Sequence, residues 1–210
     1  MTARFLVVGL AVLCSAANAA SACQKKNNPV FEEDFKNPDP GWGQPDNNAE
    51  FTPDGLVLIP PFSGSVWRSN SNLTMLQADW CIREINPASL PTPADEDAVG
   101  AVGAWFWGAD PQNFYTATIT LDGKASIDRL SHGIWQAVVA PAPAPAVNTA
   151  PGAANEIEII IQGNRLAFYV NGTLITQITG RPPENGGRPG IYAEAGPKGT
   201  RWVFPHVAMY

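Results

Sequence analysis

The feature that most constrains the fold is the alternation of apolar and polar residues between Asn155 and Ile178. Isoleucines at positions 157, 159 and 161 alternate with glutamates, and a second alternation runs through residues 166–170. A period of two residues is typical of a strand with one buried face. After the second strand, Asn171-Gly172 favours a tight turn into a third strand, because both residue types tolerate positive φ. The pattern predicts an antiparallel β-meander.

Similar strand-length patterns recur along the chain and are separated by Gly, Pro, Asn and Asp. In the clearest of them, Tyr115, Ala117 and Ile119 alternate with threonines, and Asp122-Gly123 predicts a hairpin turn. No segment has a sustained helical period. The sequence therefore predicts an all-β fold, a two-sheet antiparallel β-sandwich. Besides the meander, strands are expected at residues 30–35, 55–59, 65–69, 76–85, 100–110, 114–121, 124–130, 134–139, 190–195 and 200–210.

The segment from Ala140 to Ala154 is rich in proline and alanine and resembles an interdomain linker in composition. Proline has no N–H to donate to a ladder, so this segment cannot form a central strand. The strands on both sides need each other to bury a face. We therefore expect one sandwich domain that spans residues 23–210.

The first 22 residues have the character of a secretory signal peptide. Arg4 precedes an apolar run from Phe5 to Leu13, and small residues then lead to potential cleavage sites after Ala19 or Ala22. The apolar run is much shorter than the roughly 20 residues of a membrane-spanning helix. We expect an exported protein, periplasmic or extracellular, without a transmembrane segment.

The formal net charge of the chain is -6 at pH 7, and no cluster of Lys or Arg occurs in it. Binding to nucleic acid or to anionic lipid needs a basic patch. The composition therefore argues against both as partners.

Removal of the signal peptide also removes Cys14 and leaves Cys23 and Cys81. In an oxidising compartment these two cysteines are expected to form a disulfide that joins the N-terminal arm to a strand. The alternative is that Ala20-Ser21-Ala22 acts as a lipobox and Cys23 is acylated. The disulfide is favoured, because a lipobox normally begins with a larger aliphatic residue.

The segments GAWFWGADPQNFYTATITLDG, IDRLSHGIWQ, NEIEIIIQGNRLAFYVNGTLI, RPGIYAEAG and WVFPHVAMY follow one another in this order. Together they resemble the concanavalin A-like jelly-roll superfamily, in particular the laminin-G-like and 3-keto-disaccharide-hydrolase-type domains of exported bacterial proteins. The resemblance covers residues 31–210. It implies two stacked sheets, one of them curved, with carbohydrate often bound on the concave side. Pro205-His206 departs from the small polar pair that relatives carry in the last strand.

Glycosidases of this superfamily carry the motif Glu-X-Asp-X-Glu, because retaining hydrolysis uses two carboxylates about 5 Å apart. The only similar segment here is Glu156-Ile157-Glu158, which lacks the third acid and has Glu in place of Asp. We therefore predict no catalytic residues. A hydrolase that uses acids brought together by the fold, such as Asp128 with Glu158, is the alternative.

No cofactor is expected from the sequence. His132 and His206 lack a second His or Cys at metal-ligand spacing, so a zinc site is not indicated. A structural calcium ion is an alternative, because Glu33-Asp34 and the run from Asp95 to Asp97 offer hard oxygen ligands.

The aromatic residues carry the main functional signal, since the chain has seven tryptophans. Rings of Trp and Tyr beside polar groups suit the flat C–H faces of sugars. Alternation places Trp105 and Trp107 on one side of a strand, and residues of the next strands are expected to converge with Trp107 on one sheet face. The predicted ligand-binding residues are Trp105, Trp107, Tyr115, Arg129 and Trp135.

The predicted function is thus a non-catalytic module that binds a glycan, such as a cell-envelope polysaccharide, or another extracellular ligand. Core packing is the competing role for each tryptophan. A structural or interaction domain without a small ligand is a further alternative.

Overall fold

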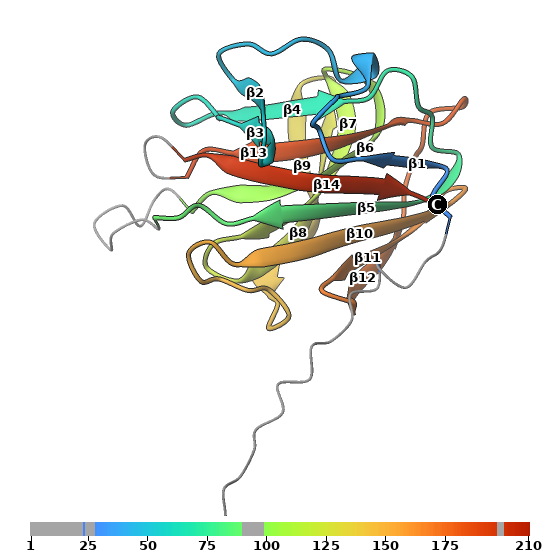
Figure 1. Cartoon of the computed structure of the whole chain (residues 1–210). Coiled ribbons are helices and arrows are strands. Elements are labelled where there is room, and N and C mark those ends of the chain that lie inside the picture. The colour runs from blue at the N-terminus through green and yellow to red at the C-terminus, as the bar shows by residue number, and fades with distance from the viewer. Residues whose placement is uncertain (1–22, 24–27, 90–98, 197–199) are drawn as a thin grey trace, which may run out of the picture.

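The chain folds into two antiparallel β-sheets that pack face to face, as the sequence predicts (Figure 1). The computed structural model describes residues 23, 28–89, 99–196 and 200–210. The predicted signal peptide, residues 1–22, lies outside the described residues. Within them, the strands form one sheet of eight strands and one of six. No helix in these ranges is long and apolar enough to cross a membrane.

The eight-stranded sheet begins with the predicted meander and continues through strands from both ends of the chain. A short additional strand, β1 (Phe31–Glu33), pairs with β14. The order in space is β12 (Thr173–Thr179), β11 (Arg165–Val170), β10 (Ala154–Gln162), β5 (Gln77–Ile85), β14 (Trp202–Met209), β3 (Gly55–Leu58) and β2 (Ala49–Thr52).

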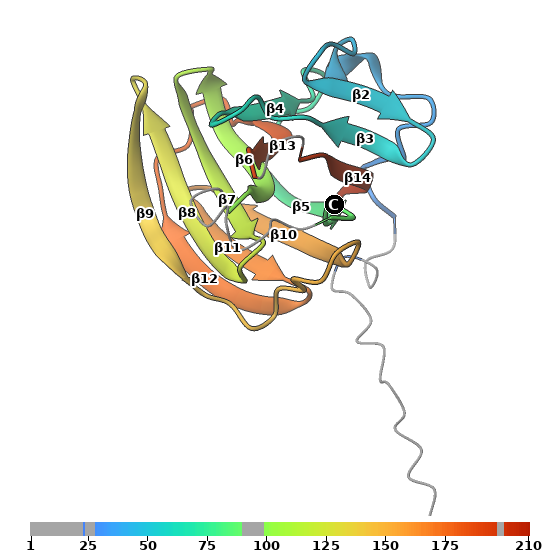
Figure 2. The ribbon, with the colours of Figure 1, turned by 90° about the vertical axis from the view of Figure 1, so that its left-hand side faces the viewer.

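The six-stranded sheet consists mainly of the long hairpins in the middle of the chain. Figure 2 shows four of its strands, β6 to β9, as a curved layer at the left. The order in space is β4 (Ser65–Ser69), β13 (Arg188–Glu194), β6 (Ala101–Asp110), β7 (Asn113–Thr120), β8 (Lys124–Ser131) and β9 (Ile134–Pro143).

The meander forms as the alternation predicts. The isoleucines at 157, 159 and 161 are buried, and Asn171 and Gly172 have φ values of 48° and 77°. Asn171 also holds the turn through its side chain. Its Oδ1 accepts from the backbone N–H of Glu156 at 2.8 Å, and its Nδ2 donates to the carbonyl of Ala146 at 2.7 Å.

Four local features differ from the sequence expectations. The strand β2 and a short 3₁₀ helix, η2 (Pro40–Trp42), were not predicted. The strand β9 extends to Pro143, four residues beyond the predicted end. It does so at the free edge of its sheet, where the missing N–H groups of proline are tolerated. The segment from Asn86 to Asp97 carries three prolines and several acids, a composition that predicts an exposed loop. Asn86 is instead buried, because its amide donates to the carbonyls of Asn148 and Ala150.

The core lies between the two sheets and is continuous from one to the other. Ile159 and Phe168 of the larger sheet and Phe106 and Ile127 of the smaller one are fully buried members of it. Trp80 adds a polar link, since its Nε1 donates to the carbonyl of Gly190 in the opposite sheet at 3.1 Å. The apolar side chains that alternate along each strand thus meet in a single layer.

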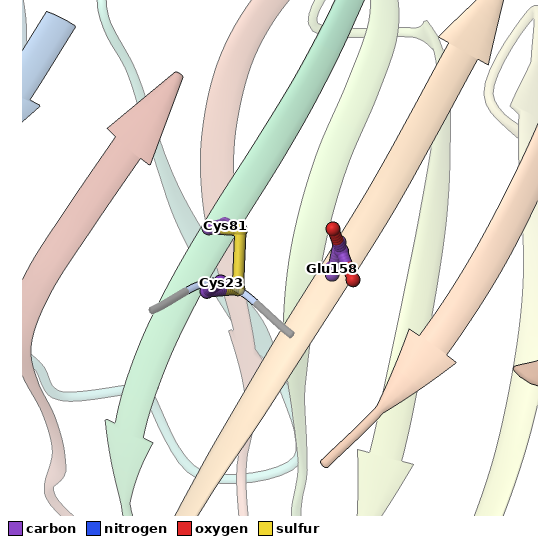
Figure 3. Close-up of side chains that lie close together, drawn as sticks. All are labelled: Cys23, Cys81 and Glu158. Carbon is purple, nitrogen blue, oxygen red and sulfur yellow. A yellow bond between two sulfur atoms is a disulfide. The ribbon is translucent and has the colours of Figure 1, made fainter. Parts of the chain in front are cut away.

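The predicted disulfide between Cys23 and Cys81 is confirmed, with a Cα–Cα distance of 5.8 Å (Figure 3). Cys81 belongs to β5 and faces away from the core, so the bond fastens the N-terminal arm to the outer side of the larger sheet. Glu158 of β10 lies beside it and is only 3% exposed. A sulfur in a disulfide cannot also carry a lipid, so the acylation alternative is incompatible with this structure.

Replacing both cysteines, Cys23→Ser with Cys81→Ser, is expected to lower the free energy of unfolding by about 2–4 kcal/mol. The cross-link closes a long loop in the unfolded chain, and its removal returns that conformational entropy. Urea unfolding of the double variant and of the native protein measures the difference. Equal midpoints with equal slopes would show that the arm adds nothing to stability.

A buried polar network closes one end of the sandwich and holds the Pro/Ala-rich segment. Asn155 Nδ2 donates to Glu84 Oε1 at 2.7 Å, and Asn155 Oδ1 accepts from the backbone N–H of Asn148 at 2.8 Å. Glu84 is fully buried, and its Oε2 has no hydrogen-bond partner. Burial raises the pKa of Glu84 from 4.5 to about 8, and the hydrogen bond from Asn155 opposes this shift only in part.

This pKa predicts that stability falls as pH rises. Between pH 4.5 and about 8 the folded protein keeps the Glu84 proton, whereas the unfolded chain has lost it, so unfolding releases a proton. The contribution of Glu84 is therefore full below pH 4.5 and is lost as pH rises through 8. Glu84→Gln is expected to flatten this dependence in urea unfolding at pH 5, 6.5 and 8. Glu184→Gln, at an exposed position, is the control and should keep the native slope.

Candidate ligand-binding face

A second cluster of aromatic residues lies outside the core, on the outer face of the six-stranded sheet. Trp105, Phe114 and Tyr192 form it, and Trp67 and Leu130 pack against them. Alternation explains their position, because the neighbours of these residues along each strand fill the core. The Nε1 of Trp105 is buried without a hydrogen-bond partner.

The contacts of Trp135 show that this outer face is concave. Trp135 lies on β9 and Tyr192 on β13, with three strands between them, yet their ring centroids are 6.3 Å apart. In a flat sheet these strands would be about 19 Å apart, at ~4.8 Å per strand spacing. The sheet must therefore curl toward this side. Trp135 also meets the ring of Phe114 edge-on, at 5.5 Å. We refer to this surface as the concave face.

Glycines make room for the rings on the concave face. A Cβ at Gly108 would lie 1.7 Å from the ring of Trp105, and one at Gly190 would lie 3.1 Å from it. The Trp105 indole therefore rests directly on the backbone of β6 and β13. A side chain at position 108 would displace the ring, and one at position 190 would crowd it.

A strip of polar side chains borders the aromatic cluster. The Oγ atoms of Thr118 and Ser126 are 3.1 Å apart, and Ser126 Oγ donates to Asp128 Oδ2 at 3.0 Å. Asp128 is half-buried, and this burial raises the pKa of its carboxyl group, an effect that the bond from Ser126 offsets only in part. On β13, the hydroxyl of Tyr192 donates to Glu194 Oε1 at 2.8 Å.

A cavity of about 440 Å³ opens on the concave face. Trp135 and Phe62 contribute its exposed apolar surface, with 46% and 81% of their areas accessible to solvent. The cavity is lined, among others, by Phe62, Ser65, Val99, Trp135, Tyr192 and Glu194. We call it the concave groove.

The structure divides the five predicted binding residues between two places. Trp105 and Trp135 belong to the concave face, Trp105 buried within it and Trp135 at its surface. The other three do not join them, so the expectation that Trp107, Tyr115, Arg129 and Trp135 converge on one sheet face is wrong. Whether any of the five binds a ligand stays a prediction.

Trp107 departs from its strand alternation for a local reason. Its φ is 46°, and the pairing of β6 with β7 shifts register between Phe106 and Asp110. A positive φ turns the side chain to the other side of the strand, so Trp107 packs in the core against Phe106, with ring centroids 5.3 Å apart. The prediction that Trp105 and Trp107 share a face is therefore wrong.

Tyr115 and Arg129 lie near Trp107, at one end of the sandwich. Tyr115 points toward the core, and its hydroxyl accepts from the backbone N–H of Arg181 at 3.1 Å. Arg129 Cζ is 5.4 Å from the centre of the Tyr115 ring, which is within the range of a cation–π interaction. With Trp107 they line a separate cavity of about 330 Å³.

The outer face of the larger sheet holds a third cavity, of about 670 Å³, beside the disulfide. His206 Nε2 is 2.9 Å from Glu32 Oε1 there, and Glu156 lies across from Arg83. Burial raises the pKa of Glu156, and the positive charge of Arg83 opposes this shift. The charged groups that line this cavity thus largely face opposite charges within the protein.

The hypothetical acid pair of Asp128 and Glu158 is not formed. Asp128 faces outward from the six-stranded sheet, whereas Glu158 faces outward from the other sheet, beside Cys81. The whole core separates them. Glu158 is also buried rather than solvent-exposed, because the N-terminal arm is fastened next to it.

Most of the candidate metal ligands are already engaged in other bonds within the protein. Among the described residues, the one group of three potential ligands is Cys23, Cys81 and Glu158, with ligand atoms within 4.8 Å of one another (Figure 3). Both of its sulfurs belong to the disulfide. Glu33 accepts backbone N–H groups from Phe35 and Asp39 with its two oxygens. The run from Asp95 to Asp97 lies outside the described residues, so the calcium alternative stays a prediction.

Sequence reasoning missed Trp67, Phe114, Tyr192 and Glu194 as members of the concave face. For Phe114 a signal was present, because it shares the parity of the outward-facing threonines of β7. For Tyr192 and Glu194 there was none, since the sequence does not state that β13 inserts between β4 and β6.

Comparison with solved structures identifies the architecture. A β-glucanase of Bacillus licheniformis has a TM-score of 0.60 at 15% identity, over 88% of this chain and 99% of that chain. The carbohydrate-binding module CBM66 of Bacillus subtilis has a TM-score of 0.59 at 14% identity, over 76% and 88%. Sheep galectin-11 has a TM-score of 0.50 at 16% identity, over 69% and 96%. The fold is a concanavalin A-like jelly roll.

At these identities the likeness shows the fold and no activity. No protein-family model matches the sequence, and no curated protein matches it either. The jelly-roll expectation is confirmed, and the narrower resemblance to laminin-G-like domains stays a prediction.

Proposed function

We propose that this protein is an exported, non-catalytic module that binds a glycan in the concave groove. The observation that carries the proposal is the half-exposed ring of Trp135, held across the concave face against Tyr192 and Phe114. A ring fixed in this way offers a flat apolar platform at little entropic cost when a ligand binds.

The surroundings of this platform suit a saccharide. The apolar C–H face of a sugar ring stacks on an indole, and its hydroxyl groups need hydrogen-bonding partners. Ser65 and Glu194 line the groove beside Trp135, and the bonded row of Thr118, Ser126 and Asp128 lies on the same face. The groove thus combines one apolar wall with polar groups around it.

Two further observations support the proposal. The structures with the same architecture include a carbohydrate-binding module, a galectin and a β-glucanase. The disulfide between Cys23 and Cys81 is compatible with an oxidising compartment outside the cytoplasm, which agrees with the predicted signal peptide.

Trp135→Ala is expected to weaken glycan binding about tenfold or more, because it removes the stacking platform. Affinity electrophoresis through gels that contain a β-glucan, a xylan or a deacetylated chitin first identifies a retained polymer, and titration calorimetry then gives the affinity. Ile134→Ala is the matched control, since Ile134 is the neighbouring exposed apolar residue on β9.

If Trp135→Ala and Ile134→Ala reduce the retardation in the gel equally, the glycan binds somewhere other than on the Trp135 ring. No retardation of the native protein by any polymer would favour the alternative of a structural or interaction domain without a small ligand.

A glycoside hydrolase is the second candidate, because two carboxyl groups share the concave face. Burial raises the pKa of Asp128, as a general acid requires, and Glu194 lies beside the groove. In that case the native protein releases new reducing ends from a bound oligosaccharide, and Asp128→Asn lowers the rate by at least about a hundredfold. Binding without any release of reducing ends would contradict this candidate.

A further inference from the structure

The concave face carries two carboxyl groups, Asp128 and Glu194, that no basic side chain among the described residues neutralises. Asp128 is bonded to Ser126, and Glu194 to the hydroxyl of Tyr192. Neither acid has a salt bridge to a basic group in the described part of the chain. By contrast, Asp46, Glu50 and Asp122 on other surfaces are each paired with an Arg or a Lys.

Both acids act on the hydroxyl group of Tyr192. Burial raises the pKa of Tyr192, and the negative charges of Glu194 and, to a smaller extent, of Asp128 raise it further. The Glu194 carboxylate contacts the Tyr192 hydroxyl directly, at 2.8 Å, and Asp128 adds a second negative charge on the same face, on β8. Of the described residues that line the groove, none is Lys, Arg or His.

The aromatic rings add to the preference for a cation. The faces of Trp and Tyr rings attract positive charge, most strongly where solvent is partly excluded. Trp135 and Tyr192 both line the groove, and their rings are inclined to each other by 67°. Tyr192 is buried behind Trp135, so a positively charged ligand here would be held by the exposed Trp135 ring and the Glu194 carboxylate together.

We infer that the saccharide bound in the concave groove carries a protonated amine, as a deacetylated hexosamine polymer does. The inference rests on the function proposed above and specifies the ligand of the same site. The sugar ring stacks on Trp135, while the ammonium group donates a hydrogen bond to Glu194 in the groove, and Asp128 on the same face adds to the negative potential. An N-acetylated sugar has the same ring but offers neither the charge nor the three donors.

The test compares two ligands that differ only in the amine. A chitosan tetramer, with free amines, and a chitin tetramer, with acetylated amines, are titrated into the native protein at pH 6 and low salt. A neutral β-glucan tetramer is the third ligand. The native protein is expected to bind the amine form at least about tenfold more tightly than the acetylated form.

Charge-removing variants then locate the effect. Asp128→Asn and Glu194→Gln should each reduce the preference for the amine severalfold. Asp54→Asn removes one charge from an exposed turn of the other sheet and should leave it unchanged. Thermal unfolding checks that each variant is folded, and the ligand comparison on the native protein needs no variant.

The outcomes distinguish this inference from the proposed function. Equal affinities for the two tetramers, with binding lost in Trp135→Ala, would overturn the inference and leave the glycan-binding function in place. If Asp54→Asn reduces the preference for the amine as much as Asp128→Asn and Glu194→Gln do, the inference is also overturned, because the net charge of the protein would then explain the preference. Binding of none of the three ligands or of the screened polymers would overturn both.

Discussion

The burial of every second side chain between the two sheets is the constraint on which the rest of the structure depends. Each strand that gives one side to the core must display the other side on an outer face. In β6, Ala104 and Phe106 enter the core, and Trp105 is thereby placed outside. The same applies to Tyr192, which lies between two core residues of β13. The position of these aromatic rings on the concave face is thus a direct consequence of how the core is packed.

Large rings on the outer face of a sheet would normally project into water. Here the curvature of the sheet keeps most of them covered. The curl brings Trp135 of the edge strand over Phe114 and Tyr192, so one ring remains half-exposed and covers the others. Gly108 and Gly190 let Trp105 approach the backbone closely. The groove therefore has a rigid apolar wall, and the acids beside it sit in a partly desolvated environment, which strengthens their electrostatic interactions.

Local patterns were sufficient to predict most of the architecture. The meander, the hairpins and the faces of β7 follow from alternation and turn residues, which act over a few positions. The prediction failed where a single backbone angle reversed the pattern, as at Trp107 with its positive φ. The site was predicted only in part, because it joins strands far apart in the sequence. Trp135 was recognised from composition, whereas its partner Tyr192 depends on a strand order that local patterns do not encode.

The prolines in β9 have a consequence for the behaviour of the protein in solution. The strand is the free edge of the six-stranded sheet, and an exposed edge is a template on which a second chain can add a strand. Pro141 and Pro143 lack the N–H groups that such an addition would need, and they stand at the end of the strand that carries Trp135. A long, solvent-exposed strand can thereby present an apolar ring without inviting edge-to-edge polymerisation of the protein.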